Sequence, residues 1–174
     1  MNRHELREQL FLLLFQHDFY TEDETKAQAE DFFACGGFVP DADDLMDEIP
    51  EDEEASRMAG IPGLGVIMRS DLADSAGKRT MSDDEVAEVR AKYENILKRL
   101  QDIDDEINLK TTGWDTTRMG KVDLTILRLA IYEILYDDNV PEGVAINEAV
   151  ELGKAYGQDN TPSFINGVLA RFAK

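Results

Sequence analysis

A nearly continuous apolar run at residues 122–136 constrains the fold of this chain more than any other feature. Its polar exceptions are Asp123, Thr125, Arg128 and Glu133, so a helix over this run would be apolar on most of its circumference. A helix of that kind is stable only where other elements cover it on nearly every side. We therefore predict a central buried helix at 122–136, with the rest of the chain packed around it.

Apolar residues recur at three- and four-residue spacing, the helical period, in several further segments. They predict helices at 2–19, 23–34, 82–108 and 144–156, and a last helix that begins near residue 161. Ser82 and Glu85 make a capping-box pattern at the start of the long helix. Thr161 and Pro162 are expected to supply an N-cap and a first-turn proline for the last helix. No segment shows strand alternation between hairpin turns, so the fold class is predicted to be all-α.

Length and composition point to a single domain over residues 1–174. No apolar run is long enough to span a membrane, and the N-terminal region has no apolar signal segment, so we expect a cytoplasmic protein. One cysteine, Cys35, excludes an internal disulfide framework and a multi-cysteine metal site. His4 and His17 are too few and too far apart in sequence to form a metal site. We predict no catalytic residue, cofactor or metal.

The net charge of −19 is unevenly distributed along the chain. Residues 22–54 hold fourteen acids and one base, a net of −13, so the remaining residues carry only −6. A general electrostatic attraction to phosphate is disfavoured by this balance. A local basic patch stays compatible with it.

Residues 36–81 lack sustained apolar periodicity and are rich in acids and glycine. We interpret them as an acidic insertion into the domain. Two alternatives stay open for this segment: a partly ordered interaction loop, or a disordered or merely decorative segment.

Three cations, Arg3, His4 and Arg7, lie at the N-terminal end of the first predicted helix. Positive charge at this end opposes the helix dipole, so local helix energetics do not explain it. The plain interpretation is solubility, and the sharper one is contact with an anionic partner.

Four motifs occur in order in the last third of the chain. They are ILRLAIYEIL at 126–135, VP at 140–141, VAINEAVEL at 144–152 and FINGVL at 164–169. In type, order and spacing they resemble the NusB family of bacterial transcription antitermination factors. Residues 2–20 and 82–113 resemble the family's first and third helices more loosely, and 36–81 has no evident family counterpart.

The resemblance implies an all-helical bundle of about seven helices in two packed subbundles, and a role that is not enzymatic. Members of the family bind a short single-stranded RNA element called boxA, jointly with the small-subunit ribosomal protein that acts as NusE. The resulting complex modifies RNA polymerase so that it reads through terminators, notably in ribosomal RNA operons. The oligomeric state stays open, with a homodimer as one alternative.

The resemblance also implies two groups of site residues. The RNA-binding group consists of Arg3, His4 and Arg7 with Asp159, Asn160, Thr161, Ser163 and Phe164. The group facing the ribosomal protein consists of Phe15 and Asp123. Single-stranded RNA is usually held by cations together with stacking side chains, which fits the composition of the first group.

This chain departs from the family pattern at its N-terminal cluster, which has few cations and has Glu5 and Glu8 interleaved. Fewer phosphate contacts predict weaker, less salt-sensitive RNA binding and a larger contribution from the protein partner. The alternative is a protein-interaction module of the same fold with weak or lost RNA binding.

Three further polar or aromatic residues allow both a structural and a functional interpretation. We interpret Asn147 and Asn166 as buried asparagines that tie helix ends together, in preference to catalytic groups. Trp114 is interpreted as a core or lid residue in preference to a base-stacking platform.

Overall fold

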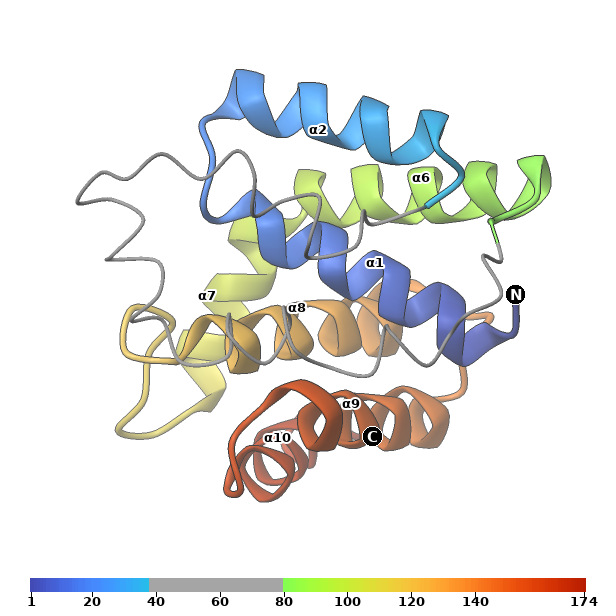
Figure 1. Cartoon of the computed structure of the whole chain (residues 1–174). Helices are drawn as coiled ribbons and strands as arrows, with labels where there is room; N and C mark the ends of the chain where they lie inside the picture. Colours follow the sequence, from blue (N-terminus) through green and yellow to red (C-terminus); the bar gives the residue numbers. More distant parts are fainter. Residues whose placement is uncertain (38–79) are drawn as a thin grey trace.

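The computed structural model describes residues 1–37 and 80–174 of the chain. These residues form seven helices and no strand, which confirms the predicted all-α class (Figure 1). The helices are α1 (Arg3–His17), α2 (Glu22–Ala34), α6 (Asp83–Lys98), α7 (Leu100–Lys110), α8 (Lys121–Tyr136), α9 (Glu142–Tyr156) and α10 (Thr161–Leu169). Most of the predicted acidic insertion, residues 38–79, lies outside the described residues.

Helix α8 is the centre of the molecule, as its apolar sequence predicts. It contacts α1, α6, α7, α9 and α10. Ile126, Leu127 and Ile131 are fully buried, and the polar residues Thr125 and Glu133 are buried with them. Burial of each large aliphatic side chain stabilises the fold by roughly 1.5–3 kcal/mol, so α8 supplies much of the hydrophobic stabilisation.

Five of the remaining helices form two groups around α8, and α7 contacts both α8 and α6. Helices α1, α2 and α6 lie together on one side, and α9 and α10 lie on the other (Figure 1). Helix α1 contacts α8, α6 and α2, so it joins the first group to the core. None of the described helices combines the length and the apolar character that crossing a membrane requires.

The prediction of one long helix at 82–108 is wrong, because the chain breaks into α6 and α7 at Arg99. This residue leaves the helical conformation (φ −108°, ψ 7°), and its guanidinium stacks 4.2 Å from the centre of the Tyr136 ring. Ile96 and Ile103, on either side of the break, are both fully buried. Because the apolar stripe continues across the break, periodicity alone could not reveal it.

Side-chain capping explains where the first helices begin. The predicted capping box of Ser82 with Glu85 at α6 is confirmed. Equivalent boxes start α1, with Asn2, and α2, with Thr21. Each box satisfies backbone N–H groups that a helix leaves unpaired in its first turn.

The end of α2 and the start of α6 lie next to each other. The Met81 N–H donates to the Gly36 carbonyl oxygen over 2.7 Å. Gly36 and Gly37 have φ values of 70° and 83°, a left-handed conformation that glycine adopts without a steric penalty. The two ends of the segment 38–79 are therefore held together by described residues.

Candidate nucleic-acid interface

Arg3 and His4 are exposed on the first turn of α1. The Arg3 guanidinium, 75% exposed, donates to Glu88 of α6. The His4 ring, 48% exposed, has its Nδ1 2.6 Å from a carboxylate oxygen of Glu148 in α9. Both residues lie at the surface, where the sequence predicts an RNA contact, but each already contacts a carboxylate.

Arg7 occupies a different environment, because its side chain is only 9% exposed. Its Nε donates to both carboxylate oxygens of Glu133, over 3.0 and 3.1 Å. Glu133 is 1% exposed and also accepts from Lys92 of α6 over 2.8 Å. Arg7 thus joins α1 to α8, and a direct contact with RNA phosphate would require this ion pair to open.

These pairs explain why cations are tolerated at the N-terminal end of α1. The helix dipole disfavours positive charge there by a fraction of a kcal/mol for each exposed group, and carboxylates from three other helices compensate it. Sequence reasoning missed these partners because Glu88, Glu133 and Glu148 are 85 to 144 residues from the cations in sequence. No local pattern signals pairs at such separations.

The residues of the predicted polar segment before the last helix differ in their exposure to solvent. Asp159, Asn160 and Ser163 are exposed. Thr161 is buried, and Phe164 is partly buried against Trp114, with ring centres 5.6 Å apart in an edge-on arrangement. Trp114 itself is 52% exposed, so of the predicted core and lid alternatives the core is wrong, and an aromatic surface borders this segment.

The prediction that Thr161 is the N-cap of the last helix is also wrong. Asn160 holds the cap position, and Thr161 is the first residue of α10. The Thr161 hydroxyl accepts from the Gln158 N–H and donates to the Asp123 carboxylate over 2.9 Å. This contact ties the start of α10 to the first turn of α8.

Asp123 is half-buried where α8 meets α10. Its burial raises the pKa of the carboxyl above the usual value, and the hydrogen bond from Thr161 only partly opposes this rise. The predicted partner residue Asp123 therefore also has a structural contact within the chain.

Phe15, the other residue predicted to face a protein partner, is 2% exposed. Its ring packs against Phe11 and Phe19, with ring centres 6.2 and 4.9 Å apart. The partly exposed aromatic residues of this end are Phe19 and its neighbour Tyr20. Phe15 thus packs beneath the aromatic surface formed by Phe19 and Tyr20, and its own side chain is almost entirely buried.

An ion-pair cluster lies beside this aromatic surface. Arg128 of α8 bridges Asp18 and Asp104, with donor–acceptor distances of 2.7 to 2.8 Å. Burial opposes ionisation of Asp18, but the hydrogen bond from His17 and the charges of Arg128 and Lys121 together lower the pKa of its carboxyl. The cluster fixes the C-terminal end of α1 against α7 and α8.

The first predicted RNA-binding segment contacts the middle of α9, and the second follows the C-terminal end of this helix. His4 contacts Glu148, whereas one turn further along α1 the Tyr156 hydroxyl donates to Glu8. Burial and the Glu8 carboxylate raise the pKa of Tyr156, which therefore keeps its proton. At 1.5 Å per residue, Tyr156 lies about 12 Å beyond Glu148 along the helix axis.

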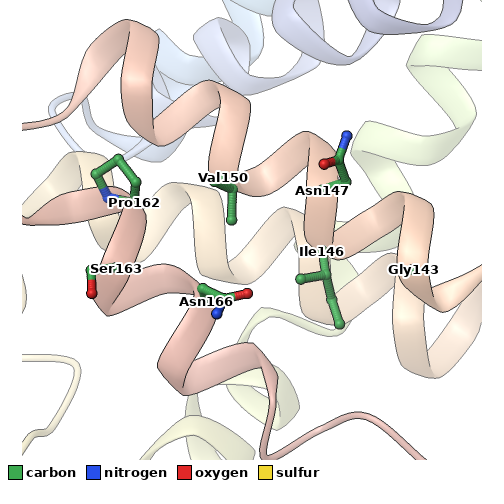
Figure 2. A pocket seen from close by; sticks show the side chains of 7 residues that line it. All are labelled: Gly143, Ile146, Asn147, Val150, Pro162, Ser163 and Asn166. Carbon is green, nitrogen blue, oxygen red and sulfur yellow. The ribbon is translucent and has the colours of Figure 1, made fainter.

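A groove of about 530 Å³ lies between α9 and α10. Its lining consists of Gly143, Ile146, Asn147, Val150, Pro162, Ser163 and Asn166 (Figure 2). Figure 2 shows the Asn166 amide directed toward the space between the helices, with Ile146 and Val150 on the opposite helix. The interpretation of Asn147 and Asn166 as buried ties is wrong, since both are exposed.

The described residues contain no group of three or more His, Cys, Asp or Glu side chains arranged to hold a metal ion.

Comparisons with known proteins agree with this architecture. The family model described as the NusB family matches residues 65–174. A protein of Lachnoclostridium phytofermentans named transcription antitermination protein NusB is 34% identical over 171 residues, which cover 98% of each chain. A protein of the same name from Agathobacter rectalis is 50% identical over 92 residues, which cover 53% of this chain and 70% of the relative.

A solved structure of T. maritima NusB has the same fold. It superposes with a TM-score of 0.63 at 27% identity, covering 99% of this chain and 91% of the other. The sequence match extends almost from end to end, and the helices agree in arrangement. This chain belongs to the NusB family.

Proposed function

We propose that this protein is a transcription antitermination factor of the bacterial cytoplasm that binds boxA-type single-stranded RNA. It binds this RNA together with the small-subunit ribosomal protein that acts as NusE. The assembled complex joins the antitermination complex on RNA polymerase and promotes read-through of terminators in ribosomal RNA operons. The protein itself catalyses no reaction.

The observation that carries this proposal is the end-to-end similarity to a relative named as a transcription antitermination protein. The surface offers suitable chemistry for RNA. Arg3 and His4 are exposed on the first turn of α1, and Asn160 and Ser163 are exposed at the start of α10. Cations, amides and hydroxyls of this kind hold the phosphates and base edges of single strands.

The paired state of the cations supports a requirement for the protein partner. A phosphate that approaches Arg3 or His4 competes with Glu88 or Glu148. Arg7 contributes from within the fold, because its buried pair with Glu133 positions the first turn of α1. RNA alone therefore gains little from these contacts, and a partner that adds its own RNA contacts makes the complex stable.

The proposed surface for the ribosomal protein lies at the opposite end of α1. Phe15 packs beneath Phe19, whose neighbour Tyr20 is exposed. Exposed aromatic residues over a rigid base are the typical anchors of protein interfaces. Asp123 acts in this proposal at the border between the partner surface and the RNA segment, since it holds Thr161.

A titration of labelled boxA-type RNA in the presence of the ribosomal protein tests the RNA surface. Arg3→Ala and His4→Ala are expected to weaken RNA binding by roughly two- to tenfold each, with a smaller dependence of affinity on salt. Lys26→Ala is the matched control, because it removes an exposed cation of α2 that pairs with Glu22. Equal affinities for all three variants and the unchanged protein would contradict the assignment of this surface.

A second candidate function is a protein-interaction module of the same fold with weak or lost RNA binding. The specific observation in its favour is that Arg3, His4 and Arg7 each contact a carboxylate. The same titration separates the two candidates, since the module would bind the ribosomal protein without increasing the affinity for RNA.

A further inference from the structure

The groove between α9 and α10 opens from a close contact of the two helices. A side-chain carbon at Gly153 would lie 3.2 Å from Thr161 and 3.5 Å from Pro162, so glycine permits the approach of α10. Gly143, nearer the start of α9, and Asn166, further along α10, line the groove. A Cβ added at Gly143 would meet nothing within 4 Å, so that end is open.

The groove combines apolar walls with neutral polar groups. Ile146, Val150 and Pro162 provide the apolar surface, while Ser163 and Asn166 provide a hydroxyl and an amide. No lining residue carries a charge. Lys154 follows Val150 by one turn of α9, and its exposed ammonium pairs with Glu151 over 2.8 Å.

The stability of the fold does not explain why an asparagine occupies position 166. Asparagine is less favourable than alanine inside a helix by several tenths of a kcal/mol. Within residues 1–37 and 80–174, the Asn166 side chain makes no hydrogen bond, and it is exposed. An exposed amide beside an apolar groove has donor and acceptor atoms available for a ligand.

We propose that this groove binds one unstacked base of the RNA, with the Asn166 amide contacting the base edge and Ile146, Val150 and Pro162 contacting its faces. The inference rests on the proposed function, and it adds a base-reading site to the phosphate contacts. A neutral lining suits a nucleobase and not a phosphate, and a carboxamide pairs with the donor and acceptor atoms of a base edge. Continuity supports the position, because Pro162 and Ser163 belong to the segment that carries other proposed RNA contacts.

The test compares Asn166→Ala with the unchanged protein, each with the ribosomal protein present. The probes are a labelled boxA-type RNA and a set of the same RNA with one base changed at a time. Alanine is the best helix former, so the variant keeps α10. Gln101→Ala is the control, because it removes an exposed amide from α7, which does not line the groove.

The expected result is a loss of discrimination at one RNA position. For that position, the ratio of affinities between original and altered RNA falls by roughly fivefold or more in Asn166→Ala, and stays unchanged in Gln101→Ala. The inference is overturned if Asn166→Ala keeps every ratio while RNA still binds. It is also overturned if the variant loses the ribosomal protein in the absence of RNA, because the groove then holds a protein segment. Absence of RNA binding by the unchanged protein rejects the proposed function as well.

Discussion

Arg3 and Arg7 lie one turn apart on α1 and have different physical roles. Arg7 is buried with Glu133, whereas Arg3 is exposed with Glu88. We expect Arg7→Ala to lower the free energy of unfolding by about 3 kcal/mol, because it leaves a buried carboxylate with only Lys92 as a partner. Chemical denaturation followed by circular dichroism measures this change.

Arg3→Ala is the control for this prediction. Removal of an exposed ion pair changes stability by less than about 1 kcal/mol. If Arg7→Ala is as stable as Arg3→Ala, the buried ion pair does not stabilise the fold. The contrast also matters for RNA measurements, since a loss of RNA binding in Arg7→Ala can follow from a loosened first helix.

Asp123→Asn is expected to raise the melting temperature at neutral pH. The pKa of Asp123 is raised in the folded state by burial, so its contribution to stability is greatest below the unfolded pKa and falls as pH rises through the folded pKa. Asparagine keeps an oxygen that accepts from Thr161 and removes the buried charge. Thermal melts at several pH values from about 3 to about 7 cover the range in which carboxyl groups titrate. The gain in melting temperature from Asp123→Asn should become smaller toward acid pH.

Asp18 provides the comparison of opposite sign. Its pKa is lowered, so it stabilises the fold above the unfolded pKa, and this contribution disappears as pH falls through the folded pKa. Asp18→Asn should therefore lower the melting temperature at neutral pH. If the melting temperature at neutral pH changes in the same direction in Asp123→Asn and Asp18→Asn, the opposite pKa shifts assigned to the two carboxyls are wrong.

The sequence shows an aspartate at both positions, and this alone could not reveal that the pKa of Asp123 is raised and that of Asp18 is lowered. The position of Asp123 at the start of the central helix was predictable, but its burial depends on α10, which follows 38 residues later. The capping box of Ser82 and Glu85 was predictable because both partners lie within one turn. Local chemistry is visible in a sequence, and the environment created by distant segments is not.

Among the helices, α6 carries a carboxylate that would compete with RNA at the proposed binding surface. Glu88 of α6 pairs with Arg3 of α1, so Glu88→Gln frees the Arg3 guanidinium. We expect the affinity for boxA-type RNA, with the ribosomal protein present, to rise by about 1.5- to 5-fold at low salt, the equivalent of an exposed ion pair. The gain should shrink at high salt because screening weakens both interactions.

Glu94→Gln is the matched control on the same helix. It removes the same charge from an exposed position that acts electrostatically on Arg90. Equal gains in Glu88→Gln and Glu94→Gln would show that net charge, and not the pair with Arg3, limits RNA binding.

Most helices were predictable as elements, and the errors share one cause. The apolar stripe at 82–108 continues through the break at Arg99, so a pattern of burial could not distinguish one helix from two. The groove between α9 and α10 was not predictable either, since it depends on how closely Gly153 lets the helices approach. Periodicity identifies buried faces, and it does not determine the angle or spacing between helices.

For the whole molecule, the described helices are expected to fold without residues 38–79. The Met81 N–H bond to the Gly36 carbonyl holds the ends of this segment together, so a linker of about four glycine and serine residues can join Gly37 to Thr80. We predict a single cooperative unfolding transition for this deletion variant. A broad, non-cooperative transition would show that residues 38–79 contribute to the core.

We expect RNA binding by this protein to depend on its protein partner. The most direct measurement is the affinity of the unchanged protein for a labelled boxA-type RNA, with and without the ribosomal protein. The paired cations of α1 predict that the partner tightens RNA binding by at least about tenfold, within the range expected for linked binding surfaces. Equal affinity in the two titrations, or no RNA binding in either, would contradict the account.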